Sequence, residues 1–185
     1  MGILGDAKTK LQRELLHIEK RDDLTDDQKV SRVRQVTCAV CAGVAVQPLP
    51  FGDIFLLTPI QGLMAYKIAA IRGVNISEQG AGQILKEILG VVGLGLAAQQ
   101  LAIGAYKTVL PFWGAVTTIP LVYSLTYAIG SLMDVYFTKK AAGEPMDDAM
   151  MKRVWKEARK ESKNEAKRAA NSKGKDQAQD VEITE

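Results

Sequence analysis

Histidine and cysteine, two side chains that often carry nucleophilic or metal chemistry, are nearly absent from this chain. His17 is the only histidine among 185 residues, and Cys38 and Cys41 are the only cysteines. A structural zinc site needs four ligands, and the sequence offers no such cluster and no nucleophile paired with a base. We therefore predict no catalytic residues, no metal site and no cofactor, and expect a protein that is not an enzyme.

The Cys-x-x-Cys spacing at 38–41 has a functional interpretation and a structural one. It matches half of a zinc site or the redox motif of thioredoxin-like proteins. The redox motif needs a βαβ setting, which the surrounding sequence does not provide. On a helix, two cysteines three residues apart act as small apolar side chains in a packed core, and we favour that interpretation.

The sequence also lacks strand-like alternation, internal repeats and a secretory signal. Residues 1–34 carry fifteen charges and no apolar run of the kind that a signal peptide needs. We therefore expect the chain to stay in the cytoplasm or on the cytoplasmic side of a membrane.

Charge is scarce only in the centre of the chain. Lysine and arginine total 24 and aspartate and glutamate total 21, so the net charge is only +3. Seven of these charged residues lie between Gln35 and Met133. We expect a charged amphipathic region over 1–34, an apolar helical core domain over 35–140, a charged helix over 141–170 and a disordered tail over 171–185.

Apolar spacings of three and four residues predict an all-α fold. The expected helices cover 3–21, 26–47, 53–72, 78–105, 112–138 and 147–170. Thr25 with Gln28 is a capping box, and Ser77 and Asp147 are N-cap residues. Gly73 can end a helix, and Gly143 with Pro145 breaks another. We expect a bundle with a central glycine-rich helical hairpin and charged helices at both ends.

The stretch at 88–100, ILGVVGLGLAAQQ, resembles the glycine fingerprint of dinucleotide-binding proteins. That fingerprint needs a preceding strand and an acidic residue about 20 positions later. The residues before it continue a helical pattern, and the next acidic residue is Asp134. We favour a helix whose glycines serve packing. Small residues on one face let two helices approach closely, and we predict such a face against the helix at 112–138, formed by Gly90, Gly93, Ala97 and Gly104.

Two uncharged stretches are long enough to cross a membrane. They cover 88–106 and 108–133, and a spanning helix needs about 20 mostly apolar residues. Basic residues flank the pair on both sides, which predicts a membrane-spanning hairpin with both termini cytoplasmic. The alternative is a soluble, cytoplasmic bundle, because Gln99 and Gln100 lie in the first stretch and Pro111 and Pro120 in the second.

The final charged helix carries a basic stripe that suggests a lipid-binding surface. The stripe consists of Lys152, Lys156, Arg159, Lys163 and Lys167. Glu157, Glu161 and Glu165 alternate with these bases, so a solvated helix held by ion pairs is the simpler interpretation. We do not expect nucleic acid as a partner. The acidic residues weaken the positive electrostatic potential of the helix, and no aromatic residue that could stack on a base follows Trp155 in the stripe.

Between residues 35 and 140 the chain resembles the bacterial family called domain of unknown function 697. The resemblance is carried by Leu49-Pro50-Phe51-x-Asp53, by Leu57-Thr58-x-Ile60-Gln61-x-x-Met64, and by Ile68-Ala69, Gly73-Val74, the glycine-rich helix and the stretch at 126–130. It implies a helical module of the inner membrane that is sometimes fused behind a P-loop GTPase domain. No phosphate-binding G-x-x-x-x-G-K-[ST] loop occurs in this chain, so a GTPase would be a separate partner.

The shared motif also has a physical interpretation. Pro48 and Pro50 fix the start of a helix, and Asp53 in its first turn can cap exposed N–H groups. The alternative is a proton carrier or ion ligand at Asp53, because ionisable residues inside membranes are often functional.

From these observations we expect a membrane-associated module that acts through protein–protein contacts, as partner or regulator of a GTPase. The alternatives are a soluble homo-oligomeric helical scaffold and a pore-forming or membrane-remodelling protein.

Overall fold

The computed structural model describes residues 2–45, 52–93 and 111–182, without the side chains at 2–4, 8, 45, 52–56, 111–118 and 167–182. These ranges contain six α-helices, one short 3-10 helix and no strand, which confirms the predicted all-α class. The helices are α1 (Gly2–Glu14), α2 (Asp26–Ala45), α3 (Gly52–Ile71), α4 (Glu78–Val92), α6 (Pro111–Ala141) and α7 (Asp148–Glu182), with the 3-10 turn at Ile18–Lys20.

Three helices begin at the predicted caps. At the start of α2, the Thr25 N–H donates to Gln28 Oε1 at 2.9 Å and the Gln28 N–H donates to Thr25 Oγ1 at 3.3 Å. Ser77 Oγ accepts from the Gly80 N–H at 3.0 Å to cap α4. Asp147 Oδ1 accepts from the Met150 N–H at 2.7 Å to cap α7. These local signals are confirmed because each cap satisfies backbone donors that the first turn of a helix leaves open.

Glycine ends two of the helices in the left-handed conformation. Gly73 has φ +76° after α3, and Gly143 has φ +70° after α6. Behind each glycine the chain closes the helix with a backbone bond, from the Val74 N–H to the Ala69 carbonyl and from the Glu144 N–H to the Lys139 carbonyl. Both predicted breaks are confirmed, and they fold α4 back onto α3 and α7 back onto α6.

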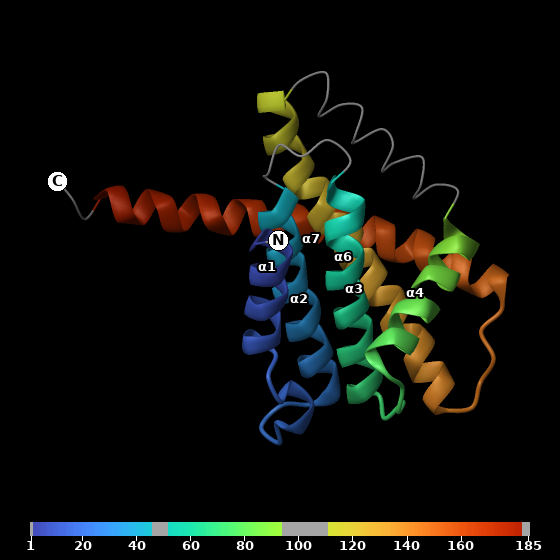
Figure 1. Cartoon of the computed structure of the whole chain (residues 1–185). Helices are drawn as coiled ribbons and strands as arrows, with labels where there is room; N and C mark the ends of the chain where they lie inside the picture. The colour runs from blue at the N-terminus through green and yellow to red at the C-terminus, as the bar shows by residue number, and fades with distance from the viewer. Residues whose placement is uncertain (1, 46–51, 94–110, 183–185) are drawn as a thin grey trace.

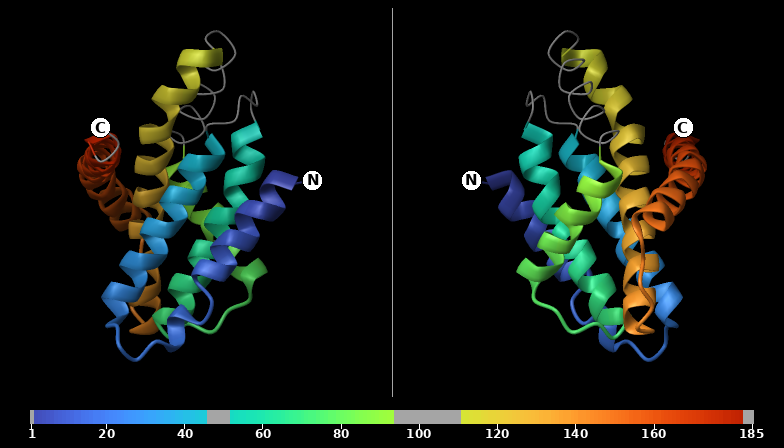
Figure 2. Two further views of the ribbon diagram at one scale, coloured as in Figure 1. Left: turned by 90° about the vertical axis from the view of Figure 1, so that its left-hand side faces the viewer. Right: turned by 90° about the vertical axis from the view of Figure 1, so that its right-hand side faces the viewer.

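Helix α6 occupies the middle of the bundle, with α2 and α3 on one side and α7 across the other (Figure 1). The two side views in Figure 2 show α7 lying against α6 and away from α1. Helix α4 packs on α3 and α7, and α1 packs on α2 and α3. The largest fully buried side chains come from α1 and the residue after it, from α3 and α4, and from α6. They are Leu11, Leu15, Leu57, Ile60, Met64, Ile68, Leu85, Leu125, Ile129, Leu132, Met133 and Phe137.

The structure describes only Gly90 and Gly93 of the predicted glycine face. Helix α4 ends at Val92, with Gly93 as its C-cap, and its main packing partners are α3 and α7 rather than α6. Gly90 is exposed, and a Cβ there would meet no heavy atom within 4 Å. Ala97 and Gly104 lie outside the described residues. Gly93 is needed for a different reason, because a Cβ there would lie 1.7 Å from the carbonyl oxygen of Leu89.

Close helix contact occurs at other glycines. A Cβ on Gly62 of α3 would lie 3.7 Å from the Cα of Gly82 on α4. A Cβ on Gly130 of α6 would lie 2.6 Å from Cγ of Arg34 and 3.1 Å from Sδ of Met64. Small residues therefore do bring helices together in this bundle, but at the α3–α4 and α2–α6 contacts.

Helix α7 is longer than the sequence predicts. The expected end near residue 170 and the disordered tail at 171–185 are replaced by helix through Glu182. No proline follows Pro145, so no residue of that type interrupts the helix. The last part of α7 extends past the bundle (Figure 1).

Candidate functional surfaces

The inner face of α7 packs against α6 and is mostly apolar. Met151, Ala158 and Ala166 are buried on this face, with Val154 and Trp155 half-buried beside them. These apolar side chains hold the first turns of α7 against the bundle.

Polar contacts add to this interface. The hydroxyl groups of Ser162 on α7 and Ser124 on α6 are both buried and lie 2.8 Å apart. The Tyr127 hydroxyl on α6 donates to Glu161 Oε1 at 3.2 Å. Helix α7 is therefore seated on α6 in a fixed orientation.

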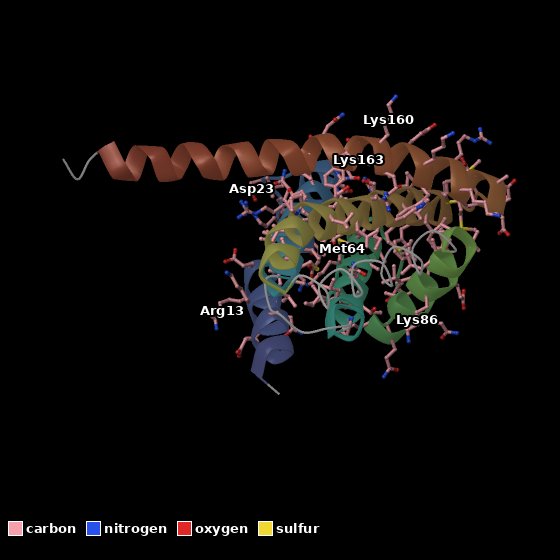
Figure 3. All side chains as sticks on the ribbon, turned by 90° about the horizontal axis from the view of Figure 1, so that it is seen from above. Arg13, Asp23, Met64, Lys86, Lys160 and Lys163 are labelled. Atoms are coloured by element: carbon pink, nitrogen blue, oxygen red, sulfur yellow. The ribbon has the colours of Figure 1, made fainter. Side chains whose placement is uncertain are left out.

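That orientation decides which bases of α7 face outward. Lys152, Lys156 and Lys163 are exposed, as predicted, but Arg159 is half-buried with its guanidinium 5.6 Å from the centre of the Trp155 ring. Burial lowers the pKa of Arg159 from its usual value. Lys160 takes its place on the outer face and points away from the bundle in Figure 3. The side chain of Lys167 lies outside the described residues.

We call Lys152, Lys156, Lys160 and Lys163 the lysine face. Their spacings of four, four and three residues keep them on one side of a helix that turns about 100° per residue. All four are exposed, and none forms an ion pair with a described side chain. The ion pairs that the alternating glutamates predict with these lysines are therefore absent from the described residues. Glu161 instead reaches Tyr127, and Glu165 is half-buried on the side toward α6.

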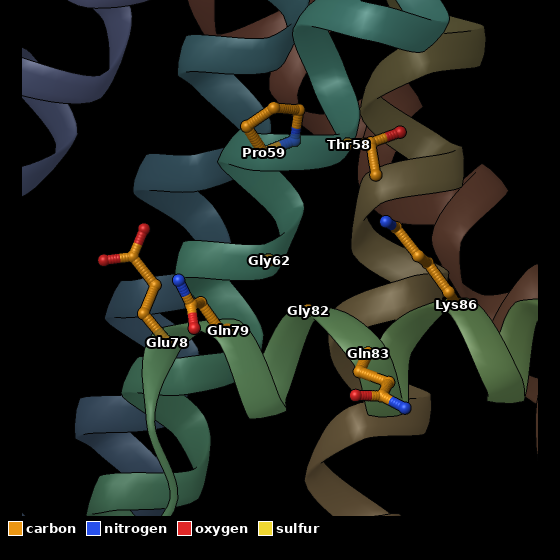
Figure 4. Close-up of a pocket in the computed structure, with 8 residues that line it drawn as sticks. All are labelled: Thr58, Pro59, Gly62, Glu78, Gln79, Gly82, Gln83 and Lys86. Atoms are coloured by element: carbon orange, nitrogen blue, oxygen red, sulfur yellow. The ribbon is translucent and has the colours of Figure 1, made fainter.

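A groove of about 780 Å³ runs between α3 and α4. Thr58, Pro59 and Gly62 line it from α3, and Glu78, Gln79, Gly82, Gln83 and Lys86 line it from α4 (Figure 4). The close approach of Gly62 and Gly82 forms its floor. The groove is open to the surface, and both polar and apolar groups line it, which suits a contact surface better than an enclosed reaction chamber.

The residues of the family motif do not form one site. Pro48, Pro50 and Phe51 lie outside the described residues, as does the side chain of Asp53, whose backbone stands in the first turn of α3. Thr58 lines the groove. Gln61 is 4% exposed and donates from Nε2 to Thr126 Oγ1 at 3.3 Å. Of this motif, Gln61 is therefore a structural link between α3 and α6.

Arg34 forms a polar cluster that the sequence reasoning missed. Its guanidinium lies 4.5 Å from the centre of the Tyr127 ring, and Nη1 donates to Ser131 Oγ at 2.9 Å. Nε is buried and has no hydrogen-bond partner among the described residues. Burial raises the pKa of the neighbouring Tyr123 to about 12. The position of Arg34 in the sequence could have indicated this cluster, because Arg34 lies on α2 between Val33 and Thr37, which are both buried.

The ion pairs of Lys67 and Arg72 join separate elements of the bundle. Lys67 Nζ on α3 lies 3.1 Å from Glu19 Oε2. Arg72 Nε donates to Asp134 Oδ1 at 2.7 Å and Nη2 to Asp27 Oδ1 at 2.8 Å, which links the ends of α2, α3 and α6. The hydrogen bond to Asp134 raises the pKa of Arg72.

The two cysteines are free and buried in α2, in accord with the predicted core role. Within the described ranges, no three histidine, cysteine, aspartate or glutamate side chains come together as metal ligands would. In the same ranges, no helix combines the length and the apolar character that crossing a bilayer requires. Most of the first predicted span, 88–106, lies outside them.

Comparison with known proteins gives no match: no family model, no curated protein and no solved structure matches the chain.

Proposed function

We propose that this protein is a non-enzymatic helical module that binds the cytoplasmic surface of a bacterial inner membrane through α7. The lysine face carries this proposal. Its four lysines are exposed along one side of α7, and none of them forms an ion pair with a described side chain. A row of lysines attracts anionic headgroups at a membrane surface.

The strength of this attraction fits reversible binding. A lysine near an anionic surface contributes about 1 kcal/mol, so four contribute about 4 kcal/mol. The net charge of the whole chain is only +3, so binding would depend on this local arrangement. Attraction between exposed charges falls within a Debye length of about 8 Å at physiological salt, so binding should weaken sharply as salt is added.

At the membrane, the module would act through a protein partner. A GTPase is the partner class that the family resemblance implies, and the α3–α4 groove is the described surface best shaped to receive a protein segment. The polar side chains buried in the described bundle support a role without catalysis, because pairs such as Gln61 with Thr126 and Ser124 with Ser162 join helices.

Vesicle sedimentation tests the membrane proposal. The full chain should pellet with phosphatidylglycerol-containing vesicles at low salt, remain in solution with neutral phosphatidylcholine vesicles, and dissociate from the anionic vesicles as salt is raised. Equal binding to both kinds of vesicle, or no binding to either, would contradict the proposal.

A further inference from the structure

The α3–α4 groove, which the proposed function assigns to a protein partner, contains a regular array of polar groups that indicates what kind of segment it would bind. Gln79, Gln83 and Lys86 follow one another at spacings of four and three residues, so they lie along one side of α4. All three side chains are exposed. Opposite them stands the exposed ring of Pro59 from α3.

Glycine keeps this groove open. A Cβ on Gly82 would meet no heavy atom within 4 Å, although Gly82 lines the groove. A side chain at position 82 would therefore not clash with the rest of the bundle. A larger residue there would occupy the groove instead, and it would also favour helix more than glycine does.

The two glutamine amides are spaced to pair with an extended peptide. Four residues of helix rise about 6 Å, and two residues of an extended chain span about 6.6 Å. A primary amide carries both a donor and an acceptor, as a peptide group does. Gln83 Nε2 donates to Glu87 Oε1 at 3.4 Å on the same helix, and this long bond would give way to a bound peptide. Gln79 and Gln83 can then pair with every second peptide group of a segment that runs along α4.

Lys86 adds a charge preference at one end of the groove. Its ammonium points toward Thr58 across the groove (Figure 4) and forms no ion pair with a described side chain. A carboxylate is the group that complements this exposed cation.

We propose that the groove binds an extended segment of a partner protein, with its backbone on Gln79 and Gln83 and an acidic side chain on Lys86. The bound segment is thus an extended peptide with an acidic side chain, and its binding requires neither the lysine face nor a membrane.

Selection from a phage-displayed library of random dodecapeptides, with the full chain as bait, tests this inference. The enriched peptides should share an acidic residue, and a synthetic copy should lose about tenfold or more in affinity for the Lys86→Glu variant, as expected for a charge-assisted contact. Replacing the peptide's acidic residue by lysine should restore binding to Lys86→Glu. Gly82→Leu should also lose binding, because the leucine side chain fills the groove.

Two matched variants give the controls. Gly90→Leu makes the same change on α4 at an exposed glycine outside the groove lining, and Lys140→Glu reverses an exposed charge on α6. Both should bind the peptide as the unchanged protein does. Failure to enrich any peptide, binding that survives Gly82→Leu, or a shared helical spacing of three and four residues would overturn the inference. Glutamine substitutions in the lysine face should leave peptide binding intact, so the two proposals can fail separately.

Discussion

The hydroxyl groups of Ser124 on α6 and Ser162 on α7 lie 2.8 Å apart, and both serines are buried. Around them, α7 presents mainly alanine and serine to α6. This contact helps to fix the rotation of α7 about its own axis. Because the buried face of α7 packs on α6, the lysine face on another side of the helix is left exposed.

Ser162→Ala should destabilise the protein by about 1–3 kcal/mol, because it leaves the buried Ser124 hydroxyl without its partner. The double variant Ser124→Ala with Ser162→Ala should cost less than the sum of the single changes, since it removes both hydroxyls together. Urea unfolding of the four proteins measures the coupling. Strictly additive effects would show that the two hydroxyls do not depend on each other.

Gly130→Ala and Gly90→Ala should change stability in opposite directions. At Gly130 the added Cβ would come 2.6 Å from Arg34 Cγ, and Tyr127 and Ser131 hold that side chain in place. Overpacking of this kind costs about 1–3 kcal/mol, which exceeds the roughly 1 kcal/mol gained when alanine replaces helical glycine.

At Gly90 the Cβ meets nothing, so only the gain in helix propensity, up to about 1 kcal/mol, remains. Thermal unfolding of both variants checks the two signs. A loss of stability in Gly90→Ala would indicate that Gly90 does pack against another helix, as the sequence first suggested.

The local parts of this fold were predictable from the sequence. Thr25, Ser77 and Asp147 cap their helices through bonds to residues only three positions away. Gly73 and Gly143 end helices through their own backbone conformation. Each of these signals depends on neighbours in the chain, so no knowledge of the packed structure is needed to interpret it.

Features that depend on distant contacts were less predictable. The sequence cannot show that Gly62 meets Gly82, or that Gly130 receives Arg34, because these pairs form only when helices pack. The same holds for the lysine face. Arg159 and Lys160 are neighbours in sequence. The way α7 packs on α6 determines that Arg159 lies against Trp155 and that Lys160 is exposed.

Cys38 and Cys41 should react slowly with a thiol reagent in the native protein. Burial raises the pKa of Cys41 to about 12 and raises that of Cys38 well above its usual value, so neither thiol forms a thiolate readily at pH 8. A chromogenic disulfide reagent should titrate two thiols in denaturant and almost none in buffer over the same time. Rapid native labelling of either cysteine would revive the redox interpretation of Cys-x-x-Cys.

Glu19 should contribute stability that disappears in acid. Partial burial acts to raise the pKa of Glu19, but a backbone hydrogen bond and the Lys67 side chain outweigh it and lower the pKa below 4.5. A depressed pKa means that the stability is fully present above the unfolded value and is lost as pH falls through the folded value.

The unchanged protein should therefore exceed Glu19→Gln in unfolding free energy at pH 7, by at most about 1 kcal/mol for this partly exposed pair. The difference should shrink below pH 4.5. Urea unfolding across that range measures it, and a difference that grew in acid would reverse the assigned sign.

Vesicle binding by two charge-matched variants tests the central claim most directly. One variant changes the lysine face, Lys152, Lys156, Lys160 and Lys163, to glutamine. The other changes four exposed bases elsewhere, Lys10, Arg13, Lys20 and Arg32, to glutamine. Both lose four positive charges, so overall charge cannot distinguish them. We predict at least a tenfold loss of affinity for phosphatidylglycerol vesicles in the first variant, from about 1 kcal/mol per lysine, and little loss in the second. Equal losses in the two variants, or none in the first, would contradict the assignment of the lysine face as the membrane contact.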